Sequence, residues 1–386
     1  MPVVTSSALG HLFRRMTHLV TGATGFVGAA IALELLERTS DDLVAIVRPG
    51  KDSALARFRQ ALVGAARAYD RALDVDAALA RCRVVAGDVA RHCCGITDEH
   101  IGHVTQVWHC AASLRYEDRF AAEITACNVD GTRNVLALAG ALGAECFNYV
   151  STAYVAGRRG GRVREEVLTD AVPNNCYEAT KQAAERLVLA SDFSRVRIFR
   201  PSVVVGHTRT LGATTFSGYY GFIRQMVQFR GMTERVQRGL LAGTPVRLRI
   251  DPDGTIDLVP IDTVAREAVT LGLGAEHAGI YHLTHAAPPP IELAVRTVFA
   301  LLGLHEPLFV REREELGWLD QKLDDRLEFY RSYIMANRTF DRSRTDAALG
   351  RTRIAAPNYD AAAIAALGRW YLDHLQRERA ALPVAR

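Results

Sequence analysis

The strongest constraint on the fold is a glycine-rich stretch near the N-terminus, Thr21-Gly22-Ala23-Thr24-Gly25-Phe26-Val27-Gly28. It follows a short apolar run and precedes a segment with a helical pattern. Glycines at this spacing allow a tight turn, a close approach of backbone to a pyrophosphate, and close packing of a helix on a sheet. The N–H groups at the start of such a helix attract phosphate. We therefore predict a dinucleotide-binding turn formed by Gly22, Thr24, Gly25, Phe26, Val27 and Gly28, with an ordinary glycine-rich turn as the alternative.

A second signal is the pair Tyr177 and Lys181, which lie four residues apart in a predicted helix and so share one face. An ammonium group beside a tyrosine favours the phenolate and lowers a pKa that is ordinarily about 10. The phenol then exchanges a proton with a carbonyl or an alcohol near neutral pH. Ser151 and Thr152 stand at the end of a predicted strand, where their hydroxyls are expected to hold a substrate oxygen. The candidate catalytic set is Thr152, Tyr177 and Lys181, with Ser151 assisting.

The first half of the chain alternates short apolar runs with helical patterns. We predict strands at 17–21, 43–47, 83–86, 106–109, 146–151 and 195–199, and helices at 25–38, 53–69, 129–142 and 177–190. Further helices are predicted at 222–229, 316–333 and 361–377. This alternation is typical of an α/β protein with a Rossmann-type, doubly wound parallel sheet, whose ligand lies at the carboxyl ends of the strands.

The pattern becomes less regular after about residue 205, which predicts a division into parts. We expect an N-terminal tail at 1–16 and a cofactor-binding Rossmann domain at 17–206. The remainder, 207–386, is expected to form a smaller, mainly helical substrate-binding region, with 246–284 returning to the first domain.

Composition argues against several classes of function. The 386 residues are 49% hydrophobic and 23% charged, as in a globular protein, and the formal net charge is only +4 without a basic run. These values do not favour nucleic-acid binding. No apolar stretch reaches the length of a membrane span. The seven cysteines lack metal-ligand spacing, so we expect no metal site and a reducing, cytoplasmic location.

In their order along the chain, these motifs resemble those of the extended short-chain dehydrogenase/reductase family over residues 17 to about 265. The resemblance rests on the glycine turn, the Tyr177–Lys181 pair, and the segments Gly87-Asp88-Val89, His109-Cys110-Ala111-Ala112, Asn128-Val129-Asp130-Gly131-Thr132 and Arg200-Pro201. Within that family, the chain looks most like the thioester-reducing branch with a male-sterility-type NAD(P)-binding domain. This branch contains fatty acyl-CoA reductases and the reductase domains of carboxylic acid reductases and peptide synthetases. The branch features are the segments 47–49, 150–155 and 259–265.

The resemblance implies a complete nucleotide site. Besides the glycine turn and Lys181, it assigns Asp88 and Val89 to the adenine, Ala111 and Ala112 to the ribose and nicotinamide side, and Asn128, Pro201, Ser202 and Val203 to the cofactor as well. Arg48 follows the second predicted strand, where NAD-preferring relatives usually carry an acid that binds the ribose hydroxyls. An arginine there suits a 2′-phosphate, so we expect NADPH, with stacking of Arg48 on the adenine as the alternative.

The same resemblance implies reduction of an acyl thioester, bound to coenzyme A or to a carrier protein, by a Thr/Tyr/Lys mechanism. The product is an aldehyde, and the sequence leaves open a second reduction to the alcohol. An acyl pocket is expected from Tyr154, Phe216, Tyr219, Tyr220 and Phe222, with core packing of these rings as the alternative. The basic segment 158–162 is either a contact for phosphopantetheine or a solvated loop.

Two other functions stay open. The first is an extended-family dehydrogenase, epimerase or dehydratase acting on an alcohol, a ketone or a sugar nucleotide. Arg48 argues against the sugar-nucleotide enzymes, which usually carry an acid at that position. The second is a non-catalytic nucleotide sensor. Such sensors commonly lose the tyrosine or the lysine, and this chain retains both.

Overall fold

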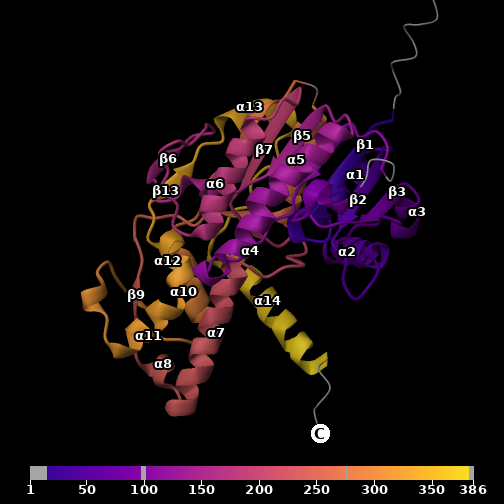
Figure 1. The fold of residues 1–386 in the computed structure, drawn as a ribbon. Helices are drawn as coiled ribbons and strands as arrows, with labels where there is room; N and C mark the ends of the chain where they lie inside the picture. Colours follow the sequence, from indigo (N-terminus) through magenta and orange to yellow (C-terminus); the bar gives the residue numbers. More distant parts are fainter. Residues whose placement is uncertain (1–14, 97–100, 275, 382–386) are drawn as a thin grey trace, which may run out of the picture.

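A seven-stranded parallel sheet organises the cofactor half of the molecule (Figure 1). The computed structural model describes residues 15–96, 101–274 and 276–381. The strand order is β11-β7-β5-β4-β1-β2-β3. The strands are β1 (Thr17–Thr21), β2 (Asp42–Val47), β3 (Cys82–Ala86), β4 (Gln106–His109), β5 (Cys146–Val150), β7 (Arg195–Pro201) and β11 (Gly279–Leu283). The predicted α/β, Rossmann-type fold class is confirmed.

Adjacent residues of the central strands point into two different cores, because side chains alternate across a strand. Leu19 and Val107 face a core shared with α5 (Gly131–Ala141) and α6 (Cys176–Leu189). Val20 and Trp108 face the opposite core, shared with α1 (Phe26–Arg38), α2 (Ala54–Ala68) and α9 (Ile261–Leu273). Helices therefore cover both faces, which explains why consecutive residues of these strands, such as Leu19 and Val20, are both apolar.

The order in which successive strands are added to the sheet reverses between β1 and β4. From β1 the strands β2 and β3 extend to one side, and β4, β5, β7 and β11 extend to the other. In the register, Thr21 at the end of β1 pairs with His109 at the end of β4, and Val150 at the end of β5 pairs with Phe199 of β7. The loops that follow these strands therefore meet at one edge, at the topological switch point where ligands bind in such sheets.

A second, separate core lies beside that edge. It is shared by α7 (Tyr219–Val236), α8 (Leu240–Gly243), α10 (Ile291–Leu301), α11 (Trp318–Arg326), α12 (Glu328–Ile334) and α14 (Ala361–Ala381). Figure 1 shows these helices together at the lower end of the molecule. Three short parallel pairs accompany them: β8 (Val203–Val205) with β10 (Leu258–Pro260), β9 (Arg247–Arg249) with β12 (Leu308–Val310), and β6 (Gly161–Val163) with β13 (Arg338–Phe340).

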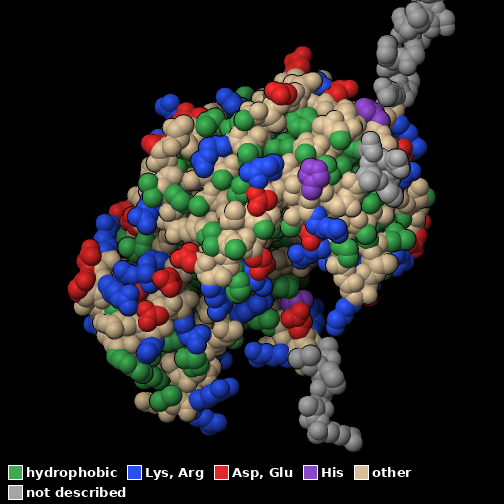
Figure 2. Space-filling view, in the orientation of Figure 1, with side chains coloured by type: hydrophobic (Ala, Val, Ile, Leu, Met, Phe, Trp, Pro, Cys, Tyr) green, Lys and Arg blue, Asp and Glu red, His purple; other side chains and the backbone are tan. Residues whose placement is uncertain are grey.

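The remaining elements are short. They include α3 (Val75–Leu79), α4 (Ala121–Thr125) and α13 (Ser343–Leu349), and a π-helical turn at Ala126–Asp130 that leads into α5. On the face shown in Figure 2, acidic and basic side chains are interspersed, as the small net charge leads one to expect. Among the described helices, none is both long enough and apolar enough to cross a membrane.

The structure confirms the six predicted strands to within a few residues at each end. The predicted helix 222–229 is the middle of the much longer α7, and the predicted helix 316–333 is divided at Leu327 into α11 and α12. Leu327 leaves the helical region of backbone angles, with φ −93° and ψ 10°. The predicted domain limits stay a prediction, and residues 1–14 of the predicted tail lie outside the described residues.

Candidate active site

The glycine turn connects β1 to α1, and its backbone is packed too tightly for side chains. Gly22 has φ +68°, and a Cβ added to it would lie 2.5 Å from the backbone nitrogen of Ala111. A Cβ added to Gly28 would lie 2.2 Å from the carbonyl oxygen of Gly22. Gly25 precedes α1, so no side chain caps the first N–H groups of that helix. A pyrophosphate fits such a cradle, because the backbone lies open to it and the uncapped N–H groups point toward it.

His109 and Asn128 hold the loop that follows β4 in place. His109 Nδ1 lies 2.7 Å from Thr21 Oγ1, and burial lowers the pKa of this histidine to about 3, so that the ring is neutral. Asn128 accepts a hydrogen bond from Ser113 N (2.7 Å) and donates to Thr180 Oγ1 (3.1 Å). Sequence reasoning placed Asn128 with the cofactor residues. In the structure, its amide joins the loop after β4 to α6, which is a positioning role.

A cavity of about 340 Å³ opens beside the turn. Among the predicted cofactor residues, it is lined by Gly22, Gly25, Phe26, Val27, Gly28, Ala112, Lys181, Pro201, Ser202 and Val203. The other predicted cofactor residues are not part of its wall: Thr24, Arg48, Asp88, Val89, Ala111 and Asn128. Arg48 directly follows β2 and Asp88 lies two residues after β3, so they lie along the same sheet edge, toward its β3 end. The roles assigned to all these residues stay predictions.

The four predicted catalytic residues all line this cavity. Thr152 follows β5, and its Oγ1 accepts from Tyr154 N (3.2 Å) and lies 3.5 Å from the carbonyl oxygen of Pro201. The hydroxyl of Ser151 is buried and has no hydrogen-bond partner among the described residues. The structure therefore brings these hydroxyls to the same cavity as the Tyr177–Lys181 pair, and the catalytic roles stay predictions.

The N-terminus of α6 positions Tyr177 and Lys181 at the cavity. Asn175 accepts a hydrogen bond from Glu178 N (3.0 Å) and caps the helix, so Tyr177 falls in its first turn and Lys181 one turn later. Lys181 is buried, and its Nζ donates to the carbonyl oxygen of Val150 (2.7 Å) and lies 4.2 Å from the centre of the Tyr149 ring. Burial lowers the pKa of Lys181 to about 8.

One electrostatic expectation was wrong. The sequence predicted that the ammonium group would lower the pKa of Tyr177, whereas burial raises this pKa above its ordinary value, and a hydrogen bond with Thr152 only partly offsets the rise. The physical reason is the direction of the lysine: its Nζ is committed to Val150 rather than to the phenol.

Three of the five residues predicted for the acyl pocket lie in the cavity wall, and their role stays a prediction. Tyr154, Tyr219 and Phe222 line the cavity, but Phe216 and Tyr220 do not. Tyr220 is fully buried and its hydroxyl accepts a hydrogen bond from Gly206 N (2.8 Å). Phe216 packs against the rings of Tyr220, Trp370, Tyr371 and His374. Tyr219 and Phe222, three apart in α7, share a helix face. These two rings and that of Tyr220 all belong to the second core, but only Tyr219 and Phe222 also reach the cavity.

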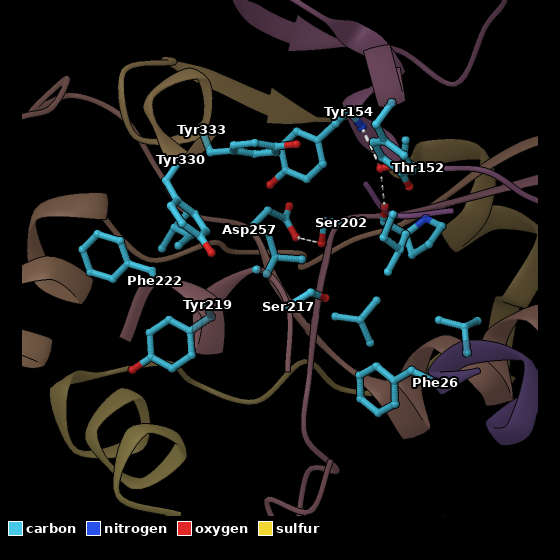
Figure 3. Close-up of a pocket in the computed structure, with 18 of the residues that line it drawn as sticks. Phe26, Thr152, Tyr154, Ser202, Ser217, Tyr219, Phe222, Asp257, Tyr330 and Tyr333 are labelled. Carbon is cyan, nitrogen blue, oxygen red and sulfur yellow. Dashed lines mark hydrogen bonds between the residues drawn. The ribbon is translucent and has the colours of Figure 1, made fainter. Parts of the chain in front are cut away.

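Several lining residues escaped sequence reasoning because they come from separate segments. Figure 3 shows Tyr330 and Tyr333 of α12 together with Tyr154, and Phe222 and Tyr219 of α7 on the same side. Further cavity residues missed from the sequence are Leu114, Ile291, Val295, Val298, Phe329, Arg338 and Phe340. No local motif marks them, since Leu114 lies in the loop after β4 and the others belong to ordinary amphipathic helices or a short strand.

Asp257 is the most unusual of the missed residues. It directly precedes β10 and is buried in the cavity wall. Its Oδ1 accepts hydrogen bonds from Ser202 Oγ and from His285 N (2.8 Å), whereas Oδ2 has no hydrogen-bond partner within the described residues. Burial raises the pKa of this carboxyl to about 6.

The basic segment 158–162 lies outside the cavity wall. Arg159 pairs with Asp170 (3.4 Å) and Arg162 with Asp341 (2.8 Å), and both arginines are exposed. Exposed ion pairs of this kind favour a solvated loop over a contact for the phosphopantetheine arm of a substrate.

Three comparisons with known proteins relate the chain to reductases. A family model described as "Male sterility protein" matches residues 20–268. Glycine betaine reductase ATRR of Emericella nidulans is 33% identical over 220 residues, which are 52% of this chain and 16% of that protein. Fatty acyl-CoA reductase 2 of Bos taurus is 26% identical over 292 residues, 66% of this chain and 54% of that protein. The chain thus spans from about a sixth to about half the length of these relatives.

Among solved structures, the chain is similar to the terminal R domain from the myxalamid PKS-NRPS biosynthetic pathway. The TM-score is 0.73 at 25% identity, and the match covers 97% of this chain and 94% of that one. At this coverage the match includes the helices of the second core as well as the seven-stranded sheet.

Proposed function

The chain belongs to the male sterility family of NAD(P)-binding reductases, within the extended short-chain dehydrogenases/reductases, and we propose that it reduces an acyl thioester with NADPH. The observation that carries the proposal is the cavity itself. Thr152, Tyr177 and Lys181 meet the glycine turn in it, and an apolar wall extends from them into the second core.

The residues of the cofactor half fit a dinucleotide. Gly22, Gly25 and Gly28 would hold the pyrophosphate, with the N-terminus of α1 behind it. Lys181 would bind the nicotinamide ribose, and Arg48 at the end of β2 would bind the 2′-phosphate that distinguishes NADPH. When bound, the reduced nicotinamide supplies a hydride.

The protein groups would act on the thioester carbonyl. The hydroxyls of Thr152 and Tyr177 donate hydrogen bonds to its oxygen, which stabilises the negative charge that develops as hydride reaches the carbonyl carbon. Tyr177 then transfers its proton to that oxygen, giving a hemithioacetal. Cleavage of the carbon–sulfur bond releases the thiol and the aldehyde. The raised pKa of Tyr177 keeps the phenol protonated, as a general acid requires.

The thiol arm of the substrate is either coenzyme A or the pantetheine of a carrier protein. Among the relatives are a fatty acyl-CoA reductase and the R domain of a carrier-protein-dependent pathway, which supports both donors equally. A second hydride transfer would carry the aldehyde to the alcohol with the same residues in the same roles.

The test is consumption of NADPH with a panel of acyl-CoA and acyl-pantetheine thioesters and the matching aldehydes. We expect thioester-dependent consumption with release of one free thiol per aldehyde formed, measured with a thiol reagent. The assays with aldehydes then show whether reduction continues to the alcohol. Activity on aldehydes or ketones with no thioester activity would contradict the proposal and favour an alcohol or ketone dehydrogenase.

A further inference from the structure

One carboxylate oxygen in the cavity wall lacks a partner. Asp257 is 5% exposed, and its Oδ1 is satisfied by Ser202 and His285. Its Oδ2 has no hydrogen-bond partner among the residues that the structure describes. A buried acceptor without a donor is costly, and a buried charge without a partner is costlier. The molecule that fills the cavity is therefore expected to bring a donor to this oxygen.

The nearby arginines are committed elsewhere. The guanidinium of Arg342, whose charge acts on Asp257, is bonded to Glu267 (2.9 Å) and Asp346 (3.1 Å). Arg338 lines the cavity, but its two terminal nitrogens donate to the carbonyl oxygens of Gly157 (2.5 Å) and Ser332 (2.7 Å). Neither arginine donates to Oδ2, so the carboxylate is available to a cation from outside the protein.

Aromatic side chains line the same cavity as Asp257. Figure 3 shows Asp257 beside Ser202, with the Tyr154–Tyr333 pair above it and Tyr330 on the side away from Thr152. The rings of Tyr154 and Tyr333 meet edge to face, with their centres 4.5 Å apart. The Arg338 guanidinium already lies 5.6 Å from the centre of the Tyr154 ring, so the rings of Tyr330 and Tyr333 are the ones expected to attract an ammonium group that the carboxylate binds. A plain hydrocarbon chain would contact the rings equally well but would leave Oδ2 unpaired.

The position of Asp257 relates this site to the reacting carbonyl. Thr152 Oγ1 lies 3.5 Å from the carbonyl oxygen of Pro201, and the next residue, Ser202, donates to Asp257. In Figure 3, Asp257 lies between Thr152 and the rings of Tyr330 and Phe222. A group bound by Oδ2 therefore belongs to the acyl part of the substrate, a few bonds from its carbonyl, and not to the thiol arm.

We infer that Asp257 selects acyl groups that carry a protonated amine, which makes a short aminoacyl thioester the substrate of this reductase. The inference rests on the proposed function for the reaction, and on the geometry around Oδ2 for the selectivity. Asp257 is then a specificity-determining residue: it touches the substrate but takes no part in hydride or proton transfer.

The variant Asp257→Asn tests this with little disturbance of the fold. An asparagine keeps an oxygen for Ser202 and His285 and replaces Oδ2 by an NH₂ group, a donor that repels ammonium. The substrates are matched pairs of pantetheine thioesters in which NH₃⁺ replaces CH₃: β-alanyl with butanoyl, and alanyl with isobutanoyl. The readout is the ratio of kcat/KM for the amine to kcat/KM for the hydrocarbon.

We expect a ratio of about ten or more in the wild-type protein and a drop of at least about tenfold in Asp257→Asn, as for loss of a hydrogen bond to a charged group. The matched control is Asp324→Asn. Asp324 is also a buried carboxylate, but it is not among the cavity residues and pairs with Arg249 (3.0 Å) and Arg331 (2.9 Å). This variant should lose stability without a change in the ratio. A wild-type preference for the hydrocarbon, or a ratio that Asp257→Asn leaves unchanged, overturns the inference.

Two further measurements separate the possible failures. If no thioester is reduced, the proposed function fails, and calorimetric titration of the protein–NADP⁺ complex with S-(3-aminopropyl)- and S-butyl-pantetheine still tests the selectivity. Amine-selective binding that Asp257→Asn abolishes would support the inference, and equal binding would overturn it. A loss of NADPH affinity in Asp257→Asn at an unchanged ratio would assign Oδ2 to the cofactor and would also overturn it.

Discussion

The two walls of the cavity are built in opposite ways. The cofactor wall comes from contiguous motifs: one turn between β1 and α1, the end of β5, and one face of α6. The substrate wall is assembled from α7, the residue before β10, α10, α12 and β13, which are separated by many residues of other structure. A local motif can therefore reveal the cofactor wall, whereas only the tertiary fold creates the substrate wall.

The walls also differ in charge. The cofactor wall offers the N-terminus of α1 and the ammonium of Lys181, both suited to an anionic cofactor. The substrate wall offers aromatic rings, the carboxylate of Asp257, and Arg338, whose terminal nitrogens are bonded to backbone carbonyl oxygens. This difference implies that cofactor binding and substrate selection can be altered independently, and three substitutions test that independence.

The largest effect is expected from Tyr177→Phe. Removal of the hydroxyl eliminates the proton donor, so kcat should fall by about 10²–10⁴-fold, while the NADPH dissociation constant changes little because the ring remains. The measurements are steady-state kinetics with a thioester and fluorescence titration of NADPH. The control is Tyr281→Phe in β11, whose buried hydroxyl donates to the carbonyl oxygen of Ala278 (3.0 Å) and does not line the cavity. Turnover retained in Tyr177→Phe would refute the assigned role.

The second substitution, Gly28→Ala, changes only the glycine turn of the cofactor wall. The new Cβ would lie 2.2 Å from the carbonyl oxygen of Gly22, so the turn must shift, at a cost of about 1–3 kcal/mol. We expect NADPH affinity to fall at least about tenfold. Among the residues of the turn, Phe26 packs against the second core from outside it, so hydrogen exchange of α7 and α14 should change little.

The matched control for Gly28→Ala is Gly64→Ala. Gly64 lies inside α2, and nothing stands within 4 Å of a Cβ added there. Alanine should therefore stabilise the protein by up to about 1 kcal/mol without altering cofactor affinity. An unchanged NADPH affinity in Gly28→Ala would show that the glycines of the turn are not needed for the cradle.

Prediction from the sequence succeeded where the signal is local and failed where it depends on the fold. Parallel strands buried on both faces carry apolar residues on both, and short apolar runs marked six of the strands. The seventh, β11, begins at a glycine, and the backbone N–H of its His282 donates to Glu165 Oε1 (2.8 Å) from more than a hundred residues away. No local pattern predicts such a partner.

The site shows the same limit. The spacing of Tyr177 and Lys181 correctly placed both on one helix face, but their pKa values depend on burial and on the direction of the ammonium group, which spacing does not encode. Asp257 is an ordinary acid in an apolar stretch of sequence. It becomes a candidate site residue only because the fold buries one of its oxygens without a partner.

The smallest of the three effects concerns the far end of the cofactor wall. Arg48 is exposed directly after β2, and its backbone carbonyl accepts a hydrogen bond from Arg57 Nη1, which fixes the backbone at the strand end. Arg48→Glu should weaken NADPH on the order of tenfold, because it replaces an attraction to the 2′-phosphate by a repulsion in a solvent-screened position. NADH, which lacks that phosphate, should be affected much less, and the carboxylate can accept from its ribose hydroxyls.

The control for net charge is Arg67→Glu, the same change of charge at an exposed position near the end of α2. It should change the dissociation constant of neither cofactor. Titration of both cofactors against the three proteins gives the result directly: equal weakening of NADPH and NADH by Arg48→Glu would mean that this arginine contacts the part the two cofactors share, and the expected preference for NADPH would have to come from another residue of this wall.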